Sequence, residues 1–190
     1  MKPSNFEFVN VVVGDLDLVV TSSHRHACRL EPRESALGWY CDLDDGTPTG
    51  ENDPASFVRW VCPALRSGGP GTGTAYPVVD VHRSEPKSDI GKLVQKFRLL
   101  TGRRPEGDAD GSFVYTDPTG VLDADVRRRI ENWPSALHGD GVVRPAELWS
   151  IRNTREGLIV DSVSWWGSAP ALDHQIRLAI EVAHRLTAQR

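Results

Sequence analysis

One apolar stripe near the end of the chain constrains the fold more than any other feature of the sequence. Its members recur every three or four residues, which places them on one face of an α-helix. They are Leu172, Ile176, Ala179, Ile180, Ala183 and Leu186. Asp173–Arg177 and Glu181–Arg185 place an acid four residues before a base, which adds about 0.3 kcal/mol for each pair. A helix with one apolar face must pack against another layer of structure.

Two strands before this helix supply that layer. The sequence predicts strands at Leu148–Arg152 and Leu158–Trp165, joined by a turn at Asn153–Gly157. The second strand is apolar on both of its faces, which is typical of a strand in the interior of a sheet. We therefore expect a sheet with the last helix lying across one face.

The start of the chain predicts a hairpin. Residues Phe6–Ser22 alternate in polarity around Gly14–Asp15, and glycine in first position suits a two-residue turn. This register pairs Val13 with Leu16 and gives one fully apolar face, so that face is expected to be buried.

The middle of the chain mixes strands and helices. Shorter strands are expected at Ala36–Leu43, Tyr76–His82 and Phe113–Tyr115. Helices are expected after the caps at Asp53, at Ser88 or Asp89, and at Asp123. Phe57, Trp60 and Val61, which follow Asp53, have helical spacing, with a strand as the alternative.

This order of elements lacks a regular βαβ alternation and indicates the α+β class. The expected fold is a largely antiparallel sheet with an N-terminal hairpin, two or three mid-chain helices, and a C-terminal strand pair followed by a long amphipathic helix. A length of 190 residues suits a single domain over 1–190. The alternative to a single unit is a chain of two lobes with their boundary at the Gly-rich loop 67–74.

Composition narrows the function classes. Hydrophobic residues make up 39% and charged residues 25%, as in globular proteins, and the net charge is −4. Without a basic excess, no nucleic-acid partner is expected. No apolar run reaches the roughly 20 residues of a membrane span, and Met1–Phe8 lacks the apolar core of a signal peptide. The three cysteines show no CxxC spacing, so no disulfide framework is predicted and a cytoplasmic location is expected.

His24 and His26 are the candidate metal ligands. On a strand they share one face about 7 Å apart, at ~3.4 Å per residue, and could hold Zn²⁺ with a third ligand. The candidates for that ligand are Asp42, Asp44 and Asp80. The alternative, which we favour, is a pair of half-exposed histidines beside a sheet edge, because no second cluster completes the site.

Three short motifs resemble known sites and lack a required residue. Gly69–Thr74 resembles the phosphate loop of P-loop ATPases but has no lysine between Gly73 and Thr74. Glu106–Phe113 resembles half of an EF-hand loop but begins with Glu, so we interpret it as a solvated acidic turn. Ser84–Lys87 matches SxxK, but Pro86 intervenes and the companion KTG is absent.

Surface residues suggest where a partner could bind. Arg128 and Arg129 are expected to point away from the apolar stripe of their helix, either as a solvated face or as a dock for an acidic partner. Trp165, Trp166 and Trp149 form the densest aromatic cluster. One of the adjacent pair, which we take to be Trp166, should face away from the core, where a loop covers it or a partner binds it.

Our first hypothesis is a non-catalytic cytoplasmic binding or regulatory protein: an adaptor, an inhibitor or an immunity-like protein that recognises a partner protein. Its candidate contact residues are Trp166, Arg128 and Arg129, and it needs no cofactor. The alternative is a small metal-dependent enzyme of hydrolase type centred on His24 and His26. An enzyme predicts a concave pocket with converging polar groups, whereas a binding protein predicts an exposed patch. A homo-oligomer is a further alternative, and it predicts one large apolar patch that obeys two-fold symmetry.

Overall fold

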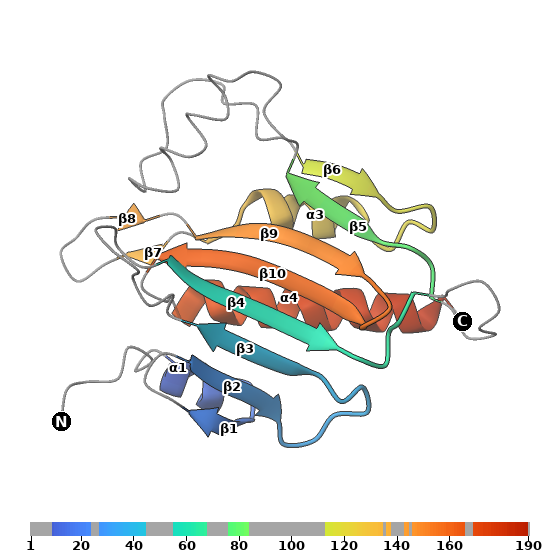
Figure 1. Cartoon of the computed structure of the whole chain (residues 1–190). Helices are drawn as coiled ribbons and strands as arrows, with labels where there is room; N and C mark the ends of the chain where they lie inside the picture. The colour runs from blue at the N-terminus through green and yellow to red at the C-terminus, as the bar shows by residue number, and fades with distance from the viewer. Residues whose placement is uncertain are drawn as a thin grey trace, which may run out of the picture.

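Eight of the described strands form one broad antiparallel sheet with helices on one side (Figure 1). The computed structural model describes residues 9–23, 27–44, 55–67, 76–83, 113–134, 136–137, 143–144, 146–165 and 169–189. The strands are β1 (Leu18–Ser23), β2 (Ala27–Pro32), β3 (Tyr40–Asp44), β4 (Ala55–Cys62), β5 (Asp80–Arg83), β6 (Phe113–Thr116), β9 (Ala146–Asn153) and β10 (Leu158–Trp165). Their spatial order is β1-β2-β3-β4-β10-β9-β5-β6. Two short strands, β7 (Ala136–Leu137) and β8 (Val143–Arg144), form a separate pair. The α+β class is confirmed.

One row of side chains crosses the covered face of the sheet. Directly paired residues from β2 to β6 supply it: Leu30, Cys41, Trp60, Val160, Ile151, Val81 and Tyr115. All are buried except Tyr115, which is half-buried at the edge. Alternation along each strand puts its other neighbours on the opposite face. The register of the whole sheet is therefore fixed by which residues enter this core.

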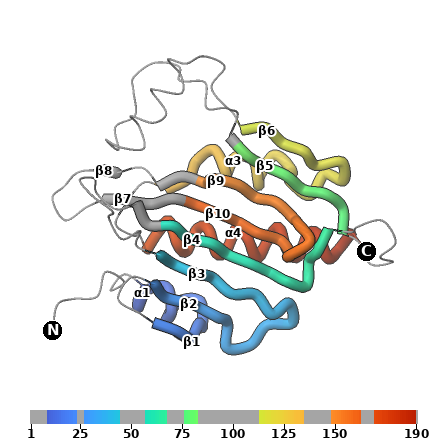
Figure 2. Tube along the Cα trace, in the orientation of Figure 1, coloured from blue at the N-terminus to red at the C-terminus, as the bar shows by residue number. Residues whose placement is uncertain are grey.

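Helix α4 (Ala169–Ala188) lies across the covered face, between α1 (Val9–Asp15) and α3 (Ala124–Glu131) (Figure 2). The predicted stripe is confirmed, because its members are buried and only Ile180 is half-buried. The predicted cap of α3 is also confirmed, since the Asp123 carboxylate accepts the N–H groups of Asp125 and Val126. The interior position of β10, between β4 and β9, is confirmed as well.

The predicted turn at Gly14–Asp15 is wrong. Residues Val9–Asp15 form α1, and the N-terminal hairpin is made one element later by β1 and β2. Val9 and Val12, three residues apart, are both buried in the core. Valine favours strands locally, but packing of this helical face against the core overrides that preference. Asp17, with a φ of 50°, lies between the helix and β1.

The helix expected at Phe57–Val61 is also wrong, and the strand alternative holds. Val58, Trp60 and Cys62 alternate into the core from β4, which pairs with β3 and β10. Two strands are shorter than predicted: β3 starts at Tyr40, and β5 at Asp80. The helix expected after Ser88 or Asp89 and most of the Gly-rich loop lie outside the described residues. The single-domain assignment stays a prediction.

One buried amide connects α4 to the sheet. Gln175 is fully buried, and its Nε2 donates to the carbonyls of Val58 (3.0 Å) and Val160 (2.8 Å). Its Oε1 accepts the hydroxyl of Ser162. The amide thus bonds to both β4 and β10, and fixes where α4 crosses them.

We expect Gln175→Leu to destabilise the protein by about 1–3 kcal/mol, because it leaves the buried Ser162 hydroxyl without an acceptor. The double variant Gln175→Leu/Ser162→Ala removes both polar partners and should recover part of that loss. Urea unfolding of the full chain measures both values. A single variant as stable as the parent would show that the amide does not position α4.

Gly157→Ala should destabilise the protein by roughly 3 kcal/mol. Gly157 has a φ of +136°, and a Cβ there would lie 2.3 Å from the carbonyl oxygen of Cys62. Gly14→Ala is the matched control, because nothing lies within 4 Å of its Cβ and the residue is helical. That control should stabilise by up to about 1 kcal/mol. Equal unfolding midpoints for the two variants would contradict the steric argument.

Candidate functional site

The sheet face turned away from the helices, here called the open face, carries a second aligned row. Directly paired residues from β2 to β6 form it: Arg29, Asp42, Arg59, Asp161, Ser150, His82 and Val114. The first four alternate in charge across four neighbouring strands. Opposite charges facing each other on adjacent strands stabilise the pairing. This row is therefore largely polar, whereas the matching row on the covered face is apolar.

Two bidentate ion pairs hold the arginines of this row. Arg29 Nε and Nη2 lie 2.6 and 2.8 Å from the two oxygens of Asp42. Arg59 Nε and Nη2 lie 2.8 and 3.3 Å from those of Asp161. Exposed pairs of this kind add at most about 1 kcal/mol to stability. Their main effect is to fix the position of each guanidinium.

Asp161 also receives a second arginine. Arg152 Nη2 lies 3.4 Å from Asp161 Oδ2. The Asp161 side chain is only 14% exposed, whereas the side chains of Arg59 and Arg152 are 53% and 46% exposed. One sheltered carboxylate thus lies between two accessible guanidiniums, called here the arginine pair (Arg59 and Arg152).

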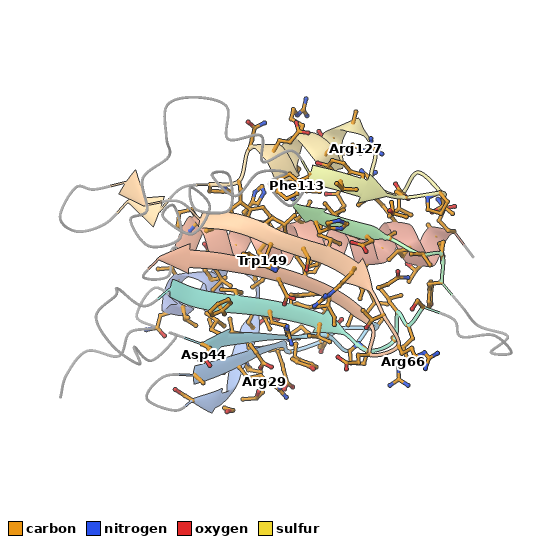
Figure 3. All side chains as sticks on the ribbon, turned by 45° about the horizontal axis from the view of Figure 1, so that its top comes forward. Arg29, Asp44, Arg66, Phe113, Arg127 and Trp149 are labelled. Carbon is orange, nitrogen blue, oxygen red and sulfur yellow. The ribbon has the colours of Figure 1, made fainter. Side chains whose placement is uncertain are left out.

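A β-bulge places Trp149 on the open face. Asp161 pairs with Ser150 and Ser162 pairs with Leu148, so Trp149 has no partner residue on β10. Leu148 and Ile151 are buried toward the helices, which leaves Trp149 and Ser150 together on the open face. Trp149 is 48% exposed and lies over the middle of the sheet, near β9 and β10 (Figure 3). The exposed Phe57 lies on the same face, two residues before Arg59.

Ser150, His82 and Asp80 bring together the residue types of a hydrolase triad without its geometry. His82 Nδ1 lies 2.9 Å from Asp80 Oδ1, and Ser150 faces His82 across β9 and β5. However, Ser150 is only 4% exposed, and its hydroxyl finds no hydrogen-bond partner in the part of the chain that the structure describes. A triad requires the serine to donate to the histidine and to meet a substrate. The arrangement therefore gives no activated nucleophile.

A shallow groove lies elsewhere, between the β2–β3 connection and the end of α4. Its volume is about 540 Å³, and apolar side chains such as Leu37, Trp39 and Ile180 line it. Among its described lining residues, only Glu34 and His184 are titratable. Its polar lining residues are Glu34, Ser35, His184 and Thr187.

Of the predicted site residues, the structure describes Arg128 and Arg129. Arg128 is exposed on α3 and pairs with Asp125, while Arg129 pairs with Glu181 and joins α3 to α4. Neither belongs to the open face. His24, His26 and Trp166 lie outside the described residues. Their roles, like those of the two arginines, stay predictions.

The carboxylates proposed as third metal ligands do lie on the open face, where other groups engage them. Asp42 binds Arg29 and Asp80 binds His82. Within the described ranges, no group of three or more His, Cys, Asp and Glu side chains could hold a metal ion. The buried thiols Cys28, Cys41 and Cys62 are free, and burial raises the pKa of each. They therefore remain protonated and unreactive at neutral pH.

Comparison with known proteins adds no assignment. No family model, no curated protein and no solved structure gives a significant match to this chain. Among the helices that the structure describes, none combines the length and the apolar character needed to cross a bilayer.

The α3–α4 contact generates a pH prediction. His174 Nε2 lies 3.1 Å from the Arg129 carbonyl oxygen, and the ring meets Trp133 edge-on at 4.9 Å. Burial lowers the pKa of His174 below its ordinary value, an effect larger than the raising effect of that carbonyl. As the pH falls through ~6.5, the unfolded chain therefore binds this proton before the folded chain does.

We expect the free energy of unfolding to fall between about pH 7.5 and pH 5.5, and His174→Gln to make this decrease smaller. Urea unfolding at a series of pH values measures both slopes. The other titrating groups are common to the two proteins, so the difference isolates His174. Identical slopes would show that burial does not shift this imidazole.

Proposed function

We propose that this chain is a non-catalytic binding protein of the adaptor, regulator or inhibitor kind, and that it recognises a partner protein through the open face. The observation that carries the proposal is the exposed Trp149 on the same face as the arginine pair, of which Arg59 is held by two hydrogen bonds. Tryptophan and arginine are the residue types most enriched at energetic centres of protein interfaces. An immunity-like role, in which the chain binds and blocks another protein, is the specific form we propose.

The rigidity of the site supports this proposal. Trp149 projects from β9, which pairs with a strand on each side, and Arg59 is held by two hydrogen bonds. Side chains that are already ordered lose little conformational entropy on binding. The exposed Phe57 adds a second aromatic contact on the same face.

The chemistry of the face also favours binding over catalysis. Arg29–Asp42 and Arg59–Asp161 are ion pairs, and within the described part of the chain the buried Ser150 hydroxyl has no hydrogen-bond partner. A binding surface needs fixed anchors and a polar surround, and this face has both. The cytoplasm is the compartment that we propose, because a reducing environment keeps three free thiols in that state.

Trp149→Ala should weaken partner binding by about 30-fold or more, the effect of losing a central anchor worth ~2 kcal/mol. The test is quantitative cross-linking mass spectrometry of proteins captured from source-cell extract by the wild type and each variant. Arg128→Ala is the matched control, because Arg128 lies on α3 rather than on the open face. It should retain the partner.

Three results would contradict the proposal. If Trp149→Ala captured as much partner as the wild type, the open face would not be the binding surface. If only Arg128→Ala lost the partner, the binding surface would lie on α3. Stoichiometric zinc in untagged protein, lost in the His24→Ala/His26→Ala variant, would favour the metal-dependent enzyme. Equal melting temperatures of the variants and the wild type must accompany each comparison.

A further inference from the structure

We infer that the arginine pair, Arg59 and Arg152, is a carboxylate-binding site, and that the partner offers it an aspartate or glutamate side chain. The inference rests on the proposed function only for the source of that carboxylate. The site itself follows from the donors, charges and neighbours of the two arginines.

The arginine pair has more donors than its own carboxylate can accept. Each guanidinium carries five N–H groups. Asp161 accepts from Arg59 Nε, Arg59 Nη2 and Arg152 Nη2, and these are the hydrogen bonds of the pair in the described part of the chain. Both side chains are about half exposed, so the remaining donors are within reach of a ligand.

The local charge favours an anion. Arg59, Arg152 and Asp161 together carry one positive charge, while the neighbouring carboxylates of Asp42 and Asp80 are already engaged by Arg29 and His82. Arginine recognises carboxylates through two parallel N–H donors, and Arg59 is already held in place by its bond to Asp161. Binding of a carboxylate therefore costs little conformational entropy at the Arg59 side chain.

The neighbours of the pair select a singly charged ligand. Asp42 faces Arg59 from β3, and Asp80 faces Arg152 from β5, so carboxylates flank the pair on both sides. A phosphate carries about −1.5 to −2 charges at neutral pH. These acids would repel it more strongly than they repel one carboxylate.

Trp149 determines which kind of partner side chain fits next to that carboxylate. It lies on the same face as Arg152, three residues earlier on β9 and next to the Ser150 that pairs with Asp161. An indole face takes an apolar side chain. The fitting partner surface is thus an acidic residue beside an apolar one.

The first test uses acetate as the probe, with acetamide as its neutral isostere. Each is titrated at constant ionic strength and neutral pH into the full-length ¹⁵N-labelled protein. We expect saturable shifts of the Arg59 and Arg152 Nε–H and Trp149 indole N–H signals with acetate, and no saturable shift with acetamide. Inorganic phosphate should shift these signals less than acetate does.

Variants separate the pair from the other arginines. Arg152→Gln should abolish the acetate response, whereas Arg29→Gln, in the same row but bound to Asp42, should leave it unchanged. An equal response to acetamide, a stronger response to phosphate, or an acetate response that survives Arg152→Gln would each overturn the inference.

The two proposals can fail separately. A partner that Trp149→Ala loses but Arg152→Gln retains, together with no acetate response, would sustain the proposed function and overturn the carboxylate site. An acetate response that needs Arg152, without any captured partner that depends on Trp149, would sustain the site and overturn the proposed function.

Discussion

The contact between α4 and the two central strands is the constraint on which the rest of the structure depends. The buried stripe of α4 covers β4 and β10, and the Gln175 amide bonds to both strands. A buried amide is tolerated only where its hydrogen bonds are made, so it allows few alternative positions for the helix. Once this face of the sheet is covered, alternation assigns every charged residue of the central strands to the other face.

That assignment explains why the charged residues of the open face are so regularly spaced. Arg29, Asp42, Arg59 and Asp161 each stand between two residues buried on the covered face, such as Val58 and Trp60 around Arg59. Their cross-strand pairing follows from the register of the core rather than from any preference of their own. The bulge at Trp149 is the one departure from alternation that the described part of β9 and β10 contains.

The sequence was sufficient where the hydrophobic period was long or the cap was explicit, as in α4, β10 and the Asp123 cap of α3. It failed at Val9–Asp15, whose valines favour a strand locally although tertiary packing makes the segment a helix. It also failed at β4, whose short apolar run fits both the helical and the strand period. Because β4 was predicted as a helix, Arg59 was not identified from the sequence. A charged residue between two apolar residues indicates an exposed sheet face only when the segment is a strand. Trp149 lay within a predicted strand, but a bulge depends on the partner strand and leaves no sign in one sequence.

The bulge also leaves the buried face of β9 independent of Trp149. Leu148 faces the core before it, and Ile151 faces the core after it, with Ser150 on the open face between them. If Trp149 were absent, Leu148, Ser150 and Ile151 would alternate without interruption, and the phase of every buried residue in β9 would be unchanged. Trp149 is therefore an extra residue in the strand. It could be deleted or replaced without changing which residues of β9 face the core.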